Sequence, residues 1–251
     1  MIRFESISKK FQKRWALAEV SFEVAAGRCL VLYGPSGCGK TTALRLVAGL
    51  EKPDQGRVWI NQRLVSSTRR MLPPHERGIG MVFQDLALWP HMSVEDHLMF
   101  ALCASPRGNA KQREAIRATL DQVGLAVDPT QFPHQLSGGE KQRLALARAL
   151  IRKPAILLMD EPLCSLDTEL KRRLLREIRR IIKESGATTI YVTHDLQEAM
   201  FVGDLLALME SGKIRDLQPV PAYGLNRIKE KESMPYDLFD GKEPISERTR
   251  P

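Results

Sequence analysis

A glycine-rich loop, GPSGCGKTT at residues 34–42, constrains the fold of this 251-residue chain more than any other feature. It directly follows the apolar run Cys29–Tyr33, which is typical of a strand buried on both faces, and a helical pattern begins at Lys40. The spacing GxxxxGK[ST] places backbone N–H groups and the positive end of a helix around one anion. The order of strand, loop and helix therefore predicts a phosphate-binding loop in an α/β sheet.

Residue type assigns the contacts within this loop. Lys40 is expected to reach the β- and γ-phosphate oxygens of ATP, and the hydroxyl of Thr41 is expected to bind Mg²⁺. The glycines let the backbone curl around the β-phosphate, and the helix adds the positive end of its dipole. The other loop residues complete the predicted ATP-binding set: Gly34, Pro35, Ser36, Gly37, Cys38, Gly39 and Thr42.

A second apolar run, ILLM at residues 156–159, delivers two acids at its carboxyl end, where open α/β sheets bind ligands. Asp160 is expected to hold Mg²⁺, directly or through water. Glu161 is expected to polarise the attacking water, because phosphoryl transfer needs a positioned nucleophile as well as charge neutralisation. Two adjacent acids alone would equally suit a helix cap, but together with the phosphate loop they predict a catalytic centre.

A third motif, LSGGEKQR at residues 136–143, opens a helix. Ser137 and the glycines that follow it form a second helix start able to receive an anion. In isolation such a turn is more often a helix cap than a ligand site. The residue order of LSGGEKQR is more specific than a helix cap requires.

Apolar patterning predicts an α/β, P-loop NTPase core with two additions. Residues 2–8 and 20–24 alternate apolar and polar side chains, as antiparallel strands with one wet face do, and a further strand pair is predicted at 57–60 and 79–83. The region from 93 to 152 is predicted helical, with breaks at 105–109 and 127–133. Parallel strands follow at 155–159, 188–192 and 205–209. The core thus carries an N-terminal antiparallel β-subdomain and an inserted α-helical subdomain at about 90–152.

Composition narrows the functional classes. No run approaches the ~20 apolar residues of a spanning helix, and no apolar segment follows the first basic residues, so the chain is expected to stay in the cytosol. The four cysteines, Cys29, Cys38, Cys103 and Cys164, lack the spacing of a zinc site or disulfide framework. The net charge of +8 and the basic face of the helix at 168–184 are interpreted as solvated surface, and no nucleic-acid partner is expected.

The three motifs, in this order and spacing, resemble those of the nucleotide-binding subunits of ABC transporters, and the match spans about residues 1–215. The resemblance implies an ABC ATPase fold and further roles. Phe11 would stack on adenine. Gln84 would contact Mg²⁺ and the attacking water and sense the membrane partner. Asp167, in SLD, would communicate across a dimer, and His194, in YVTHD, would contact the γ-phosphate, although a lone histidine after a strand is more often structural.

The resemblance also implies a head-to-tail dimer with a second copy or a paralogous ATPase subunit. ATP held by the loop of one subunit would be covered by Ser137, Gly138, Gly139 and Glu140 of the other. Position 140 is a departure, because the family often has Gln there. Little loss is expected, since the backbone and Ser137 make the main phosphate contacts, although a carboxylate nearby could weaken closure. The γ-phosphate supplies contacts that exist only in the closed state, so its hydrolysis reopens the dimer.

Residues 76–98 resemble the importer branch, which implies a permease, an extracytoplasmic solute-binding protein and a peripheral place at the cytoplasmic face of the membrane. Leu86, Leu88, Trp89 and Pro90 would lie near the groove that receives the permease, although ordinary packing is an equally good interpretation. An exporter subunit is the main alternative. A soluble ABC ATPase acting on DNA or the ribosome would predict two fused cassettes or a coiled-coil insertion, which the sequence does not show.

The ATPase domain is expected to span residues 1–217. Residues 218–251 are rich in proline and charge, and we expect a short, loosely attached tail. Many related importer subunits carry an additional regulatory β-domain after the core, and these residues are too few to build one.

Overall fold

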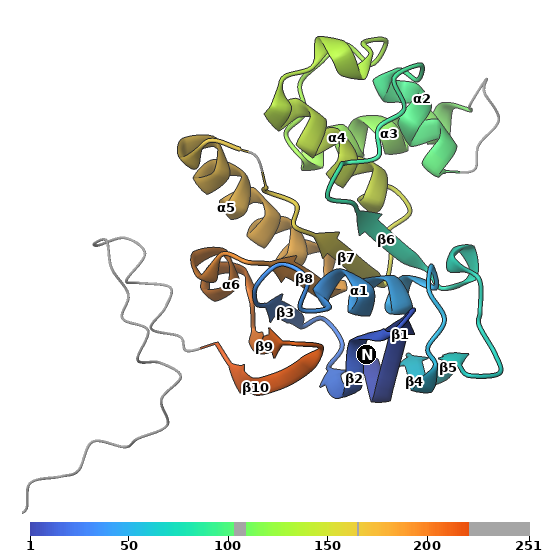
Figure 1. Ribbon diagram of the computed structural model, residues 1–251. Helices are drawn as coiled ribbons and strands as arrows, with labels where there is room; N and C mark the ends of the chain where they lie inside the picture. Colours follow the sequence, from blue (N-terminus) through green and yellow to red (C-terminus); the bar gives the residue numbers. More distant parts are fainter. Residues whose placement is uncertain (103–108, 165, 221–251) are drawn as a thin grey trace, which may run out of the picture.

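The computed structural model describes residues 1–102, 109–164 and 166–220 (Figure 1). Its centre is a six-stranded sheet. Five strands are parallel, and the edge strand β10 (Lys213–Pro219) is antiparallel to its neighbour β9 (Leu205–Glu210). In spatial order the strands are β10, β9, β3 (Cys29–Tyr33), β8 (Thr188–Thr193), β7 (Ile156–Asp160) and β6 (Ile79–Val82). The strand before the phosphate loop therefore lies at the middle of the sheet.

The two faces of this sheet belong to different hydrophobic cores. Leu30 and Leu32 of β3 point into a core shared with helix α1 (Lys40–Ala48) and the antiparallel sheet, whereas Val31 points into the core that contains residues of α5 (Thr168–Ser185) and α6 (Leu196–Val202). Because successive strand residues face opposite sides, an all-apolar strand is what burial on both faces requires. The prediction for β3 is confirmed.

A second, four-stranded antiparallel sheet forms the N-terminal β-subdomain and packs on the α1 side. Its order is β2 (Arg14–Val24), β1 (Ile2–Phe11), β4 (Gln55–Ile60) and β5 (Arg63–Ser67). The predicted pairing of residues 57–60 with 79–83 is wrong, because β4 pairs with β1 and β5 while β6 joins the other sheet beside β7. Strand β5 was missed, since its hairpin turn uses Asn61 and Gln62 at positive φ rather than the usual Asn-Gly.

The helical subdomain lies at the top of Figure 1, away from the antiparallel sheet. Its α-helices are α2 (Val94–Ala101), α3 (Ala110–Gln122) and α4 (Gly138–Leu150), and single 3₁₀ turns occur at Pro133–Gln135 here and at Pro74–Glu76 before β6. Each α-helix starts with a capping box in which a side-chain oxygen and the third residue of the helix satisfy each other's backbone N–H groups. These local signals place the three helix starts.

The C-terminal end of α1 is held by the buried guanidinium of Arg77. Its Nη1 atom donates to the carbonyl oxygens of Leu46 at 3.0 Å and Val47 at 2.8 Å, and Nη2 donates to the Ser66 hydroxyl at 2.7 Å. Burial lowers the pKa of Arg77 to about 10. The cation therefore caps the helix that begins at the phosphate loop and ties it to β5.

Strand β10 runs to Pro219, two residues beyond the predicted end of the ATPase domain at residue 217. The remainder of the predicted tail, residues 221–251, lies outside the described residues. Among the residues that are described, every helix is too short or too polar to cross a membrane.

Candidate active site

The phosphate loop takes the conformation that its glycines permit. Gly39 has φ of 109°, and a Cβ there would lie 2.3 Å from the carbonyl oxygen of Ala16. At Gly34 a Cβ would lie 2.2 Å from the carbonyl oxygen of Met209. Backbone thus approaches the loop from β2 and β9, and only glycine fits at these two positions.

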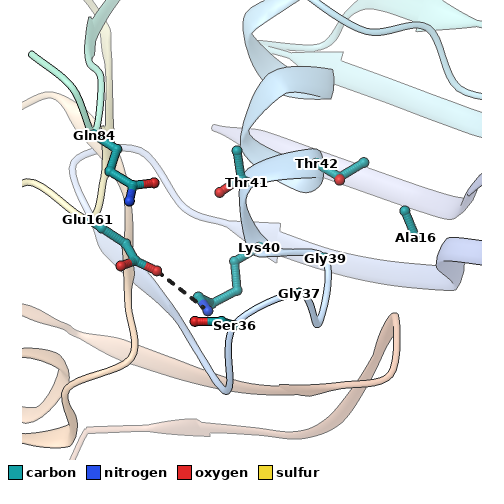
Figure 2. A pocket seen from close by; sticks show the side chains of 9 residues that line it. All are labelled: Ala16, Ser36, Gly37, Gly39, Lys40, Thr41, Thr42, Gln84 and Glu161. Carbon is teal, nitrogen blue, oxygen red and sulfur yellow. Dashed lines mark ion pairs between the residues drawn. The ribbon is translucent and has the colours of Figure 1, made fainter. Parts of the chain in front are cut away.

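Lys40 is the first residue of α1 and is 4% exposed. Its Nζ atom donates to the carbonyl oxygens of Gly34 at 2.8 Å and Pro35 at 3.0 Å, so the side chain folds back over the loop. Nζ also lies 3.7 Å from Oε1 of Glu161, the ion pair drawn in Figure 2. The loop lysine and the acid predicted to polarise water therefore meet across the same cavity.

Thr41 and Asp160 meet although they are far apart in the sequence. The Thr41 hydroxyl donates to Oδ1 of Asp160 at 2.9 Å. Burial raises the pKa of Asp160, and the hydrogen bond from Thr41 opposes that rise. A carboxyl whose charged form is disfavoured by burial is stabilised by a nearby cation.

Glu161 and His194 follow the neighbouring parallel strands β7 and β8. Glu161 has φ of 43°, and its N–H donates to the carbonyl of Val192 at 3.1 Å. The carboxylate of Glu161 lines the cavity, and its Oε2 lies 3.0 Å from Nδ1 of His194. A left-handed conformation at a non-glycine residue is costly and is often found at functional sites.

Lys40, Thr41 and Glu161 border a cavity of about 330 Å³ (Figure 2). Its lining residues are Ala16, Ser36, Gly37, Gly39, Lys40, Thr41, Thr42, Gln84 and Glu161. All except Ala16 were predicted site residues. Ala16 carried no signal in the sequence, because only tertiary packing brings the backbone of β2 against Gly39.

The residues present suit Mg²⁺. Thr41 and Asp160 offer two oxygen atoms within hydrogen-bonding distance of each other, and the Gln84 side chain lines the same cavity. In the described part of the chain no three His, Cys, Asp or Glu side chains cluster as a metal cage. Magnesium at a phosphate site needs no such cage, since it is usually held by one or two protein oxygens, water and the substrate's phosphates.

The LSGGE residues lie at another place on the protein. Ser137 caps α4, and its N–H and hydroxyl each donate to Oε2 of Glu140 at 2.7 Å, bonds that lower the pKa of Glu140. Within the described residues, none of the four LSGGE positions predicted to contact ATP lines the cavity. A Cβ at Gly139 would lie 3.1 Å from Leu170, so this helix start sits beside the start of α5.

Besides the LSGGE positions, several predicted residues lie outside the lining: Phe11, Gly34, Pro35, Cys38, Asp160, Asp167 and His194. Phe11 ends β1 and pairs with Arg14 of β2, which lies two residues before Ala16. Phe11 is 44% exposed, and Lys9 Nζ lies 5.0 Å from the centre of its ring. Asp167 caps α5 by accepting from the N–H groups of Glu169 and Leu170. Phe11 thus pairs with β2 two residues from Ala16, which lines the cavity, and Asp167 lies beside the LSGGE helix.

The parallel sheet, the phosphate loop and the acids at the end of β7 define a P-loop α/β protein of the ABC ATPase class. The family described as ABC transporter matches residues 17–164. Two solved structures of dimeric ATP-binding cassettes, one in a post-hydrolysis state with ADP and Pi, share the fold with a TM-score of 0.77. They are 27% and 28% identical and cover 88% of this chain and 100% of theirs. The chain belongs to the ABC transporter family.

Curated relatives narrow the comparison further. The trehalose/maltose import ATP-binding protein MalK of Thermococcus litoralis is 44% identical over 86% of this chain and 59% of its own length. The Fe(3+) ions import ATP-binding protein FbpC of Agrobacterium fabrum is 44% identical over 87% and 63%. The spermidine/putrescine import protein PotA of Protochlamydia amoebophila is 42% identical over 88% and 59%. This chain therefore spans about three fifths of these relatives.

Proposed function

We propose that this chain binds ATP with Mg²⁺ and hydrolyses it to energise solute uptake through a separate membrane permease. The observation that carries the proposal is the meeting of Lys40, Thr41, Gln84 and Glu161 around one cavity, with Asp160 bonded to Thr41 at its edge. Phosphoryl transfer depends on positioning and charge stabilisation, and this set offers a cation, two metal-binding oxygens and a carboxylate base.

Each side chain has one task in this proposal. Lys40 exchanges its carbonyl partners for β- and γ-phosphate oxygens, and the backbone N–H groups of residues 34–42 hold the phosphates together with the helix dipole. Glu161 accepts the proton of the attacking water, which Gln84 helps to orient. Bound Mg²⁺, held by Thr41 and Asp160, would neutralise phosphate charge.

A second copy of the chain, or a paralogous subunit, completes the site. Ser137, Gly138, Gly139 and Glu140 form a helix start that lies outside the cavity of their own protomer, which supports a role across an interface. The adjacent Asp167 would contact the facing subunit, and Phe11 would stack on adenine. The two solved cassettes that share this fold are dimeric, which supports a partner copy.

The permease is expected to dock beside Trp89. This side chain is 38% exposed and meets Phe100, which is 57% exposed, edge to face at 4.9 Å. Arg148 of α4 donates to the carbonyls of Leu86 and Ala87. The segment just before Trp89 is therefore bonded to α4, the helix that Ser137 caps. The import names of the relatives support uptake, with the chain at the cytoplasmic face and a solute-binding protein outside.

Hydrolysis by the purified chain tests the proposal. The parent should release phosphate from ATP in a Mg²⁺-dependent reaction, and Glu161→Gln should nearly abolish turnover while ATP-dependent dimerisation, measured by sedimentation, remains. Glu184→Gln is the matched control, because this exposed acid lies at the far end of α5. A Glu161→Gln variant with parental turnover would show that the base is assigned wrongly.

Nucleotide binding is tested separately by calorimetry. Lys40→Ala should lose ATP affinity, since the buried ammonium is the cation that faces the phosphates. A parent that neither binds nor hydrolyses ATP, or a Lys40→Ala variant with unchanged affinity, would contradict the proposed site.

A further inference from the structure

A partly buried polar network centred on Lys171 adjoins the turn that carries His194. Its Nζ atom is 2.6 Å from Oδ2 of Asp195 and 2.7 Å from Oε1 of Glu198. The Glu198 side chain is 4% exposed and that of Lys171 is 26% exposed. Two carboxylates therefore share one ammonium at the start of α6.

The two acids fix the backbone on both sides of His194. The Thr193 hydroxyl donates to Oε2 of Glu198 at 2.8 Å and accepts from the N–H of Asp195 at 3.0 Å. Asp195 in turn caps α6 through the N–H groups of Gln197 and Glu198. The residues immediately before and after His194 thus belong to one hydrogen-bonded unit.

Tyr191 closes this unit on the sheet side. Its hydroxyl donates to Oε2 of Glu198 at 2.8 Å, from strand β8. The Glu198 carboxylate thus accepts from two hydroxyls and from Lys171. Buried polar groups of this kind hold one geometry when all partners are present and destabilise it when one is removed.

Lys171 reaches this unit from another element. It lies in the first turn of α5, where its N–H donates to the carbonyl of Asp167 at 2.9 Å. Burial by itself would lower the pKa of Lys171, but the hydrogen bonds and charges of Asp195 and Glu198 raise it above the ordinary value. The ammonium therefore stays charged at neutral pH and balances both acids.

We propose that Lys171 is a positioning residue for hydrolysis, which holds the turn carrying His194 at the distance from Glu161 that the site requires. This inference rests on the ATPase function proposed above. Without the ammonium, Asp195 and Glu198 face each other uncompensated, and the turn between β8 and α6 has to move to separate or solvate them. The 3.0 Å contact between His194 and Glu161 is lost with that movement.

Steady-state ATPase kinetics give the first test. Lys171→Met should lower kcat by about ten-fold or more while KM for ATP changes less than about two-fold, because displacing the His194 ring by about an ångström slows the chemical step without weakening ATP binding. Lys171→Arg, which keeps the charge, should restore most of the rate. Arg173→Met is the matched control, since Arg173 is an exposed base two residues along the same helix.

Histidine ring NMR of the nucleotide-free protein gives a second readout that does not depend on turnover. The chain has five histidines, and the His194 signals are assigned by their loss in His194→Gln. They should shift in Lys171→Met and in Asp195→Asn and stay in place in Arg173→Met. Asp195→Asn keeps the cap of α6 but removes one charge from the network. It therefore tests whether the ion pairs of Lys171 position His194 if Lys171→Met does not fold.

The outcomes separate the two proposals. A parent without Mg²⁺-dependent hydrolysis contradicts the ATPase function, while the His194 spectrum still decides the positioning role. Unchanged His194 signals in folded Lys171→Met, or in Asp195→Asn if Lys171→Met is unfolded, overturn that role. An equal loss of kcat in Lys171→Arg and Lys171→Met, or a rise in KM that matches the loss of kcat, also overturns it.

Discussion

The Nδ1 atom of His194 lies 3.0 Å from Oε2 of Glu161. Because a carboxylate only accepts hydrogen bonds, Nδ1 is the ring nitrogen assigned the hydrogen. Phosphate oxygens are acceptors too. A γ-phosphate oxygen that accepts the hydrogen bond from Nδ1 therefore replaces Glu161 as its acceptor. The Glu161 carboxylate is then free to accept a hydrogen bond from water.

This competition predicts the behaviour of His194→Ala. Removing the ring should lower kcat by about a hundred-fold, the range expected for a positioned group in proton transfer or charge stabilisation, with ATP affinity largely kept. Phosphate release and calorimetry measure the two quantities. His75→Ala is the control, because that side chain is 76% exposed and its acidic partner is Glu76 rather than Glu161. Parental turnover in His194→Ala would remove the histidine from the mechanism.

The Thr41–Asp160 pair predicts a specific metal phenotype. Thr41→Val removes the hydroxyl that bonds Asp160 at 2.9 Å and should raise the Mg²⁺ concentration needed for half-maximal hydrolysis by about ten-fold, the loss typical of a disturbed metal-site partner. Thr41→Ser keeps the oxygen and should behave like the parent, and chelation of Mg²⁺ should stop hydrolysis in all three proteins. The same Mg²⁺ dependence in Thr41→Val and the parent would exclude Thr41 as a ligand.

Arg77 predicts a stability defect rather than a catalytic one. Arg77→Met leaves the carbonyls of Val47 and Leu72 and the Ser66 hydroxyl without their buried donor. Each orphaned group costs about 1–3 kcal/mol, so we expect a loss of about 3 kcal/mol or more in the free energy of unfolding, measured with urea. Arg63→Met is the control, because Arg63 is a half-exposed arginine of β5. It should change the free energy of unfolding by less than about 0.5 kcal/mol. Equal midpoints for the two variants would contradict the capping role.

The Asp195–Lys171 pair predicts a pH-dependent contribution to stability. Burial would raise the pKa of Asp195, but the hydrogen bond and charge of Lys171 hold it below its ordinary value. A lowered folded-state pKa stabilises the fold above the unfolded pKa of about 3.9, and this contribution is lost as pH falls through the folded pKa. Asp195→Asn should therefore be less stable than the parent at pH about 7, and the difference should shrink below pH about 4. A difference that stays constant in urea unfolding across this range would contradict the linkage.

Much of the fold followed from local patterns. The alternating N-terminal strands, the fully apolar β3 and β7 and the helices that start at Ser93, Asn109 and Ser137 each carry a signal within a few residues. The misassigned pairing of residues 57–60 with 79–83 shows the limit. Whether neighbouring strands in sequence pair in space is decided by which core each one completes, and the two strands complete different sheets.

The sequence by itself determined the motifs of the site: the loop from Gly34 to Thr42, the acids at the end of β7 and the LSGGE helix start are each contiguous, and their residue types predict phosphate and metal binding. Only the tertiary structure decided which residues distant in the sequence come into contact. The approach of Ala16 to Gly39, the bonds of Lys171 to the residues beside His194 and the capping of α1 by Arg77 join positions far apart in the chain. Such contacts depend on strand order and burial, which no local pattern encodes.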